Sequence, residues 1–121
     1  MIVRTLESRT LIRANDDTAL RELFNPLIDA LPVSFSLAHA ALPVGAASAR
    51  HHLEGSMEIY YILSGEGRMH IDDDSRPVAT GDTVFIPAGS IQWLENTGDS
   101  DLCLLAMVEP AWRAESDLRD E

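Results

Sequence analysis

The feature that most constrains the fold is a series of short apolar segments, each followed closely by a turn signal. From about residue 33 onward the apolar residues recur with a period of two, the period of a strand with one buried face. Clusters of turn-forming residues, such as Ser64-Gly65-Glu66-Gly67 and Asp72 to Pro77, separate the segments. Many short strands joined by close turns predict an all-β sandwich or barrel.

The first quarter of the chain carries a different pattern. Its apolar residues recur at helical spacing behind residues that can cap a helix, and Pro26 stands where the helix would end. These apolar residues are Leu20, Leu23, Phe24 and Leu27. We therefore expect a single domain in three parts: a strand and helical arm over residues 1–32, a barrel over residues 33–110, and an acidic arm over residues 111–121.

The chain is strongly acidic, with a formal net charge of −11 from nine basic and twenty acidic residues. A field of this sign repels phosphate groups, which argues against nucleic-acid partners and against anionic membrane surfaces. The chain has one cysteine, Cys103, and no apolar stretch approaches the roughly 20 residues of a membrane-spanning helix. These features predict a cytoplasmic protein.

Two of the expected strands, at residues 57–63 and 102–108, are apolar on both faces. A strand that belongs to an isolated barrel needs only one apolar face. A second copy of the chain that covers the outer face explains the pattern, so we expect a homodimer.

One carboxylate stands inside an apolar strand. Glu58 shares the parity of Tyr60, and burial of a carboxylate is costly unless it is paired, protonated or bound to a cation. A structural pair with Arg50 is one explanation. The other is a site shared with His51 and Gln92, in which imidazole, carboxylate and amide oxygen would suit one divalent ion such as Zn, Mn, Fe or Ni.

The spacing of these residues resembles the two sequence motifs of the cupin superfamily. Gly45, His51, Glu58 and Gly65 stand at the spacing of the first motif, and the second motif is matched by Gly81, Pro87, Gly89 and Asn96. The resemblance covers roughly residues 35 to 108. It implies a cupin-type jelly-roll barrel whose interior holds a site for one divalent metal ion.

The chain departs from that pattern at two of the four metal-ligand positions. Leu53 stands where the first motif has its second histidine, and Gln92 stands where the second motif has its histidine. His51 and Glu58 are the matching ligands that remain. The pattern resembles that of a small single-domain cupin subfamily, and it predicts a metal site that is weak, incomplete or absent.

Three further histidines are candidates for the site. His52 lies one residue before the missing ligand and faces away from the cavity unless a bulge turns it inward, which would make it a metal ligand. His39 shares the apolar face of its strand, as a core residue or as a pocket residue beside Tyr60. His70 follows Met69, and the hairpin register decides whether it reaches the pocket.

The sequence therefore supports two functions and leaves open whether the chain is an enzyme. The first is a small-molecule-binding cupin without an organic cofactor, in which Glu58 and His51 contact the ligand or act as base and acid. The second is a metal-dependent dioxygenase, decarboxylase or sugar-type isomerase that uses His51, Glu58 and Gln92 around a divalent ion. The fold alone does not choose between them.

Overall fold

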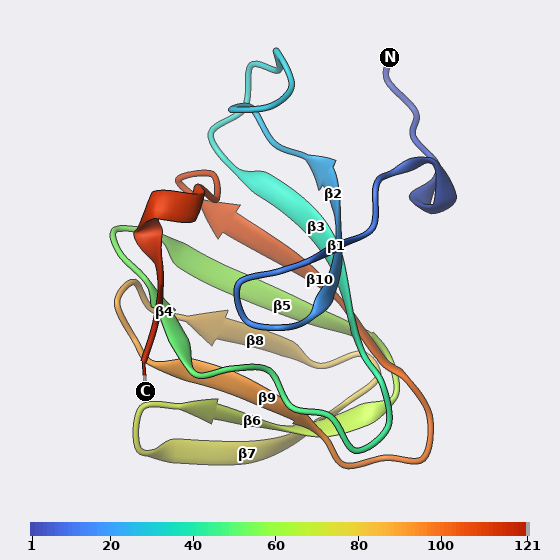
Figure 1. Cartoon of the computed structure of the whole chain (residues 1–121), viewed down its shortest axis with the longest axis vertical. Coiled ribbons are helices and arrows are strands. Elements are labelled where there is room, and N and C mark those ends of the chain that lie inside the picture. The colour runs from blue at the N-terminus through green and yellow to red at the C-terminus, as the bar shows by residue number, and fades with distance from the viewer. Residues whose placement is uncertain (121) are drawn as a thin grey trace.

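The computed structural model describes residues 1–120, and its two antiparallel sheets lie face to face (Figure 1). The elements, in chain order, are η1 (Leu6–Ser8), β1 (Ile12–Arg13), β2 (Ala19–Phe24), β3 (Ser36–Leu42), β4 (His51–Leu53), β5 (Met57–Ser64), β6 (Glu66–Ile71), β7 (Asp74–Ala79), β8 (Thr83–Ile86), β9 (Gln92–Asn96), β10 (Leu102–Glu109), η2 (Ala114–Ser116) and β11 (Asp117–Arg119). The predicted all-β class is confirmed.

The two ends of the chain join different sheets. The first sheet has the order β1-β2-β3-β10-β5-β8, and the second has the order β11-β4-β9-β6-β7. The N-terminal strands β1 and β2 therefore extend one edge of the first sheet, whereas β11 forms an edge of the second sheet. Segments outside the expected barrel over residues 33–110 are thus built into both layers.

The predicted helical segment near the N-terminus is wrong, because residues 19–24 form strand β2. Leu20 pairs with Ala40 and Glu22 pairs with Ala38 in an antiparallel register with β3. The register shifts between Glu22 and Phe24, as it does at a β-bulge. A bulge adds one residue to the strand and interrupts its period of two. The apolar residues of this segment therefore recur at the spacing expected of a helix.

The helices of residues 1–120 are two short 3-10 turns, η1 and η2. Neither is long or apolar enough to cross a bilayer.

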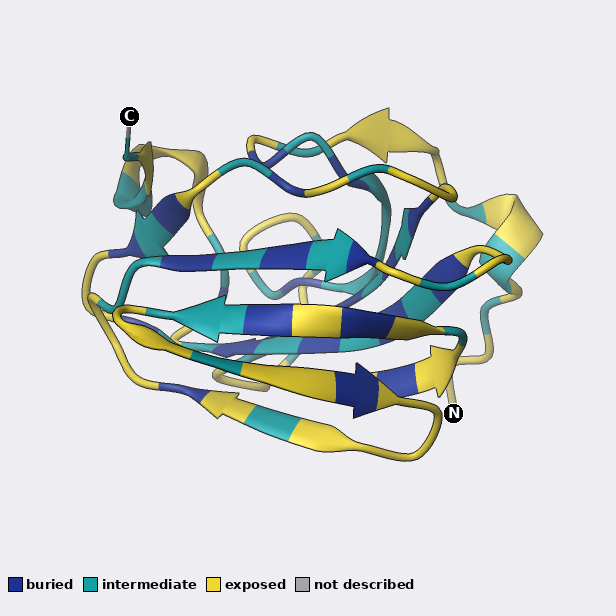
Figure 2. Cartoon of the chain, turned by 90° about the horizontal axis from the view of Figure 1, so that it is seen from below, coloured by how far each residue is buried: buried dark blue, intermediate teal, exposed yellow. Residues whose placement is uncertain are grey.

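The central strands β5 and β10 alternate between buried and less buried residues, over 57–63 in β5 and over all of β10. Figure 2 shows bands of buried and less buried residues along the strands of the sandwich. The inward side chains of β10 are Leu102, Leu104, Ala106 and Val108. The inward side chains of β5 are Glu58, Tyr60 and Ile62, so the carboxylate points into the sandwich with the core. The predicted parity of Glu58 and Tyr60 follows from this alternation.

The C-terminal arm returns across the sandwich after β10. Trp112 donates its backbone N–H to the Ser36 hydroxyl oxygen of β3 at 2.9 Å. Strand β11 then pairs with β4, with Asp117 opposite Leu53 and Arg119 opposite His51. This pairing brings the acidic arm, which the sequence left as a separate part, directly beside the first motif.

Candidate functional site

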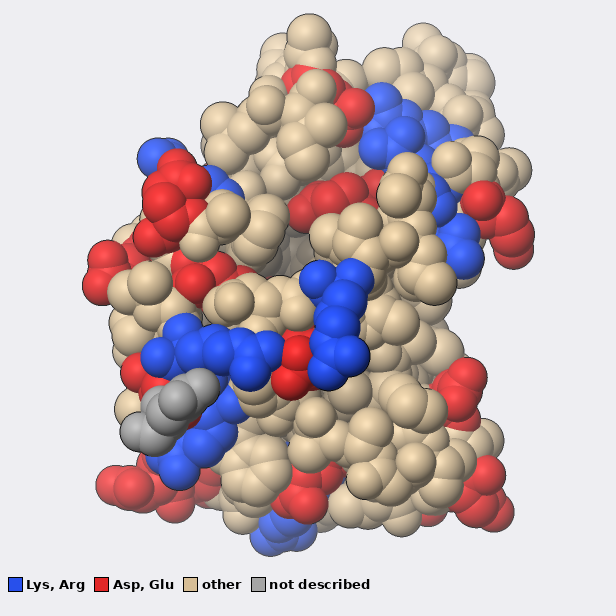
Figure 3. All heavy atoms as spheres, viewed as in Figure 1, with Lys and Arg blue, Asp and Glu red and all other residues tan. Residues whose placement is uncertain are grey.

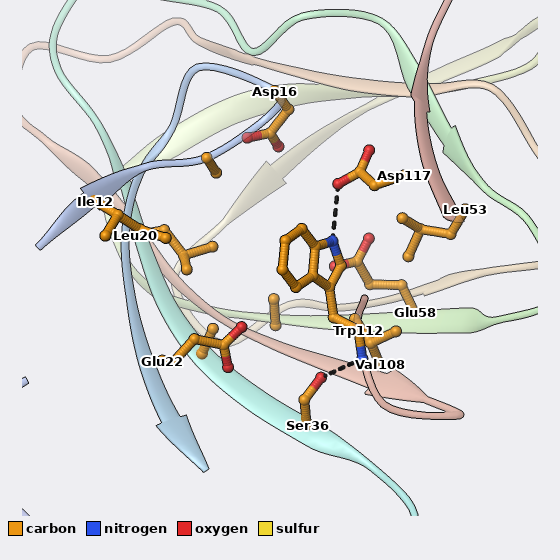
Figure 4. Close-up of a pocket in the computed structure, with 13 residues that line it drawn as sticks. Ile12, Asp16, Leu20, Glu22, Ser36, Leu53, Glu58, Val108, Trp112 and Asp117 are labelled. Carbon is orange, nitrogen blue, oxygen red and sulfur yellow. Dashed lines mark hydrogen bonds between the residues drawn. The ribbon is translucent and has the colours of Figure 1, made fainter. Parts of the chain in front are cut away.

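A small cavity of about 50 Å³ lies where the N-terminal hairpin and the C-terminal arm meet strands β3, β5 and β10. It is lined by Ile12, Ala14, Asp16, Leu20, Glu22, Ser36, Ala38, Leu53, Glu58, Ala106, Val108, Trp112 and Asp117. Figure 3 shows a hollow in this face of the molecule with charged side chains around it, and Figure 4 shows the lining residues. Most of the wall is aliphatic, so the polar groups in it stand out.

His51 is held between two aspartates that come from outside the two motifs. Its Nδ1 lies 2.8 Å from Asp117 Oδ1 of β11, and its Nε2 lies 3.4 Å from Asp16 Oδ2 of the loop between β1 and β2. Burial lowers the pKa of His51, but the Asp117 hydrogen bond and the charges of Asp16, Asp117 and Glu58 outweigh it and raise the pKa above its ordinary value. His51 Nε2 is buried and makes no hydrogen bond to any described residue.

Asp117 is the anchor of this arrangement, because it accepts three hydrogen bonds. Its Oδ1 accepts from Asn15 Nδ2 at 3.0 Å as well as from the His51 ring, and its Oδ2 accepts from Trp112 Nε1 at 2.9 Å. Burial raises the pKa of Asp117, yet the hydrogen bonds from His51, Asn15 and Trp112 hold that pKa below its ordinary value. The carboxylate therefore stays ionised and fixes both the histidine ring and the indole.

Glu58 projects from β5 into the cavity, only 7% exposed. Its Oε1 is buried and has no hydrogen-bond partner among the described residues. Burial raises the pKa of Glu58 to about 8; His51 and the Gln92 amide oppose the rise, while Asp16 and Asp117 add to it. At neutral pH the group is mainly a neutral acid, able to give or take a proton.

Glu22 is a second carboxyl group of the same kind on the opposite part of the wall. It comes from β2, lines the cavity, and its buried Oε2 has no partner among the described residues. Burial raises the pKa of Glu22 to about 7; Asp29 adds to the rise, while Asn25 and Arg9 oppose it. Neither Glu22 nor Glu58 forms an ion pair with any of residues 1–120.

Tyr60 and Gln92, which are also predicted to belong to the site, form a hydrogen-bonded pair behind the cavity wall. Tyr60 donates its hydroxyl to Gln92 Oε1 at 3.0 Å, and both side chains are buried. Neither lines the cavity, whereas Glu58 does. The Gln92 oxygen expected to serve a metal ion therefore already accepts a hydrogen bond.

The structure does not bring the remaining three histidines to the cavity. His39 pairs across the first sheet with Arg21 and Leu105, on the face opposite the interior. His52 Nδ1 lies 2.8 Å from Asp120 Oδ2, outside the site. No register shift turns this residue inward.

His70 lies on the outer face of the second sheet. Its ring stacks on Trp93 with centroids 3.7 Å apart, and its Nε2 lies 2.6 Å from Glu95 Oε1. Strand alternation places all three of these histidines outside, because each directly follows a buried residue of its strand.

Sequence reasoning missed most of the cavity wall. In the sequence, Asp16 is one of the residues that can cap a helix and Asp117 lies in the acidic arm, whereas Glu22 carries no signal of a site. Each reaches the site through long-range strand pairing, which leaves no local signal. The one local hint is Trp112, whose large apolar ring in a polar arm indicates that the arm packs on the barrel.

The side chains that could hold a metal ion are His51 and Glu58, each with a buried unpartnered atom, together with Asp16. The four-position cupin set does not fit, because Leu53 has no donor atom and Gln92 Oε1 accepts from Tyr60. Within residues 1–120, no three His, Cys, Asp or Glu side chains are arranged to share an ion. A metal ion would require side chains to move.

The raised pKa of Glu58 predicts that stability falls with rising pH. The unfolded chain loses this proton near its ordinary pKa of 4.5, whereas the folded chain keeps it up to about 8. The free energy of unfolding should therefore decrease as pH rises from about 5 to 8, with Glu58 contributing on the order of a few kcal/mol. His51 and Glu22, whose pKa values are also raised, act in the same direction.

Urea unfolding of chelator-treated protein at several pH values measures this dependence. Glu58→Gln should reduce the dependence, whereas Glu109→Gln, which makes the same chemical change outside the cavity, should keep the part of the slope that Glu58 contributes. A wild-type stability that is constant or rises between pH 5 and 8 would contradict the burial of an unpaired Glu58.

Asp117 and Asp120 offer a matched pair for testing how His51 is held, because each carboxylate lies 2.8 Å from its histidine. Asp117→Asn should lower the pKa of His51, measured by NMR titration of the ring, and destabilise the fold by about 1–3 kcal/mol. Asp120→Asn should leave the titration of His51 as it is. Equal effects of the two substitutions on His51 would show that Asp117 has no special role.

Comparisons with known proteins agree with this fold. A family model described as a cupin domain matches residues 38–108. An uncharacterized protein of Methanocaldococcus jannaschii is 39% identical over 100 residues, which cover 83% of this chain and 79% of the relative. An oxalate-binding protein of Thermotoga maritima is 42% identical over 71 residues, which cover 59% of each chain.

A solved structure extends the likeness to three dimensions. The crystal structure of a predicted oxalate decarboxylase from Thermotoga maritima has a TM-score of 0.79 and 32% identity, and the match covers 91% of this chain and 99% of that one. The family model spans more than half of the chain and includes both motifs, with His51 and Glu58 inside it. The chain therefore belongs to the cupin family.

Proposed function

We propose that this cupin binds a small molecule in the cavity beside Glu58. The observation that carries the proposal is Glu58 Oε1, a buried oxygen on the wall of a cavity that accepts no hydrogen bond from any residue the structure describes. A buried polar atom left unpaired costs about 1–3 kcal/mol, which a hydrogen-bond donor on a ligand would offset. His51, with its unpartnered Nε2, provides a second polar contact next to the cavity.

The relatives supply a first ligand to test. One is named an oxalate-binding protein and another a predicted oxalate decarboxylase. Oxalate is small enough to make a cavity of about 50 Å³ a reasonable site once side chains adjust. The acidic groups on the wall oppose a dianion, so oxalate binding here would need an accompanying cation.

The alternative is a metal-dependent cupin enzyme, a dioxygenase, decarboxylase or sugar-type isomerase, that uses His51, Glu58 and Gln92. The observation that favours it is the coincidence of two buried unpartnered atoms, His51 Nε2 and Glu58 Oε1, at positions of the first motif. Asp16 adds an oxygen 3.4 Å from that nitrogen. Against it stand Leu53 and the hydrogen bond from Tyr60 to Gln92.

The test combines metal content with ligand binding. Elemental analysis of protein purified without added metal or chelator should show substoichiometric transition metal. Calorimetric titration should then find a small molecule that binds saturably and that binds Glu58→Gln at least about 10-fold more weakly, the loss expected for one hydrogen bond to a buried polar group. Glu109→Gln serves as the matched control.

A stoichiometric transition metal that is lost in Glu58→Ala would overturn the metal-free proposal in favour of the metal enzyme. Ligand binding that is unaffected by Glu58→Gln would place the binding site elsewhere.

We also propose that the chain forms a homodimer through the outer face of the first sheet. This face carries the outward residues of β5, β8 and β10, namely Ile59, Tyr61, Leu63, Phe85, Leu105 and Met107. Phe85 is 58% exposed and Tyr61 is 45% exposed, which is unusual for aromatic side chains on one contiguous apolar face. A two-fold axis through such a face pairs it with itself.

Light scattering after size exclusion tests the dimer. We expect a dimer for the wild-type chain and for Arg68→Glu on the second sheet, and a monomer for Tyr61→Glu. A wild-type monomer at all concentrations up to the millimolar range would contradict the proposal.

A further inference from the structure

We propose that the ligand of this cavity carries a positive charge, as a protonated amine or an amidinium group on a small organic molecule. The inference rests on the proposed function and specifies the chemical class that the site accepts. It is carried by the juxtaposition of four carboxyl groups, two of them with an unpartnered buried oxygen, around one apolar cavity that no arginine lines.

The four carboxyl groups come from four separate parts of the chain. Asp16 belongs to the loop after β1, Glu22 to β2, Glu58 to β5 and Asp117 to β11. Figure 4 shows them arranged around the Trp112 indole. Four independent segments that each direct a carboxyl group to one small space form a site, unlike a run of acidic residues on a surface loop.

Two of these carboxyl groups have an oxygen that forms no hydrogen bond with any described residue. Glu58 Oε1 and Glu22 Oε2 are both buried and both lack a hydrogen-bond partner. Glu58 is 7% exposed and lines the cavity, so water in the bulk does not satisfy it. Two acceptors on different parts of one wall match a ligand group that carries several N–H donors, as ammonium and amidinium groups do.

Among the described residues, the positive charges near these acids balance them only in part. All nine basic residues are arginines, and none of them lines the cavity. Arg13 and Arg119, near the N-terminal hairpin, pair with Asp17 on the exposed side. The positive charge that His51 can carry lies between Asp16 and Asp117 and offsets Glu58 only in part, as Arg9 offsets Glu22. Neither Glu22 nor Glu58 forms an ion pair with a residue in the described part of the chain.

The rest of the wall suits the organic part of such a ligand. Ile12, Leu20, Leu53 and Val108 provide aliphatic surface, and the Trp112 ring provides an aromatic face. An aromatic face attracts a cation through its quadrupole, and more strongly where water is excluded. A volume of about 50 Å³ corresponds to a few water-sized groups, so the cationic part that enters has few heavy atoms.

The experiment uses the full chain, treated with chelator and dialysed, and follows the indole N–H signal of Trp112 by NMR. Trp93→Phe assigns that signal, because the chain has two tryptophans. The probes are methylammonium, ethylammonium, guanidinium and acetamidinium as cations, acetamide as a neutral analogue, oxalate and acetate as anions, and Mn²⁺ and Zn²⁺ as metal ions.

We expect at least one organic cation to shift the Trp112 signal saturably, and to bind more tightly than acetamide and the anions. Glu58→Gln and Glu22→Gln should each weaken that binding by about 10-fold or more, the loss expected for one hydrogen bond that involves a charged group. Glu109→Gln keeps an unpartnered side chain outside the cavity and should bind as the wild type does.

Saturable binding of acetamide, oxalate or acetate without an organic cation would overturn the charge assignment while leaving the proposed binding function intact. Binding of Mn²⁺ or Zn²⁺ alone would overturn it in favour of the metal enzyme. If no probe of any class shifts the signal, both the charge assignment and the proposed binding function fail.

Discussion

The alternation of side chains along β5 and β10 is the constraint on which the rest of the structure depends. These strands pair in the middle of the first sheet, with Tyr60 opposite Ala106 and Glu58 opposite Val108. Every second side chain is sealed between the layers, and a slip by one residue would turn the whole apolar set outward. Glu58 is therefore held inside by the burial of its neighbours. The free energy gained by burying those apolar side chains offsets the cost of burying the carboxyl group.

Part of the site is built on this barrel by segments that the family pattern does not include. The family model matches residues 38–108, whereas Asp16, Glu22, Trp112 and Asp117 lie on either side of that range. Strands β2 and β11 attach these residues to opposite sheets. One barrel can therefore present different cavity walls when its terminal arms change, which fits the general finding that function is set by sites placed on a fold.

The sequence predicts the barrel well because strand alternation and turn residues are local signals. It also predicts that Glu58 points inward, since its parity is shared with Tyr60 and Ile62. It predicts a helix where the structure has strand β2, because a bulge in this strand leaves its apolar residues at helical spacing. The three outer histidines illustrate a related limit, because the face that each strand presents depends on register as well as on residue type.

The cavity wall was beyond sequence reasoning for a further reason. Asp117 reaches His51 only through the pairing of β11 with β4, and the two residues are 66 positions apart. Asp16 likewise reaches His51 across the sandwich. The substitution of Leu53 for a histidine was visible in the sequence, but the two aspartates that instead flank His51 were not.

Titration of the Glu58 side-chain carboxyl carbon by NMR, in chelator-treated protein without ligand, tests the central claim most directly. A buried and unpartnered carboxyl group should stay protonated at pH 7 and titrate at a pKa of about 8. A pKa near the ordinary value of 4.5 would show that Glu58 is solvated or paired, and the cavity would lose the group on which its proposed function rests.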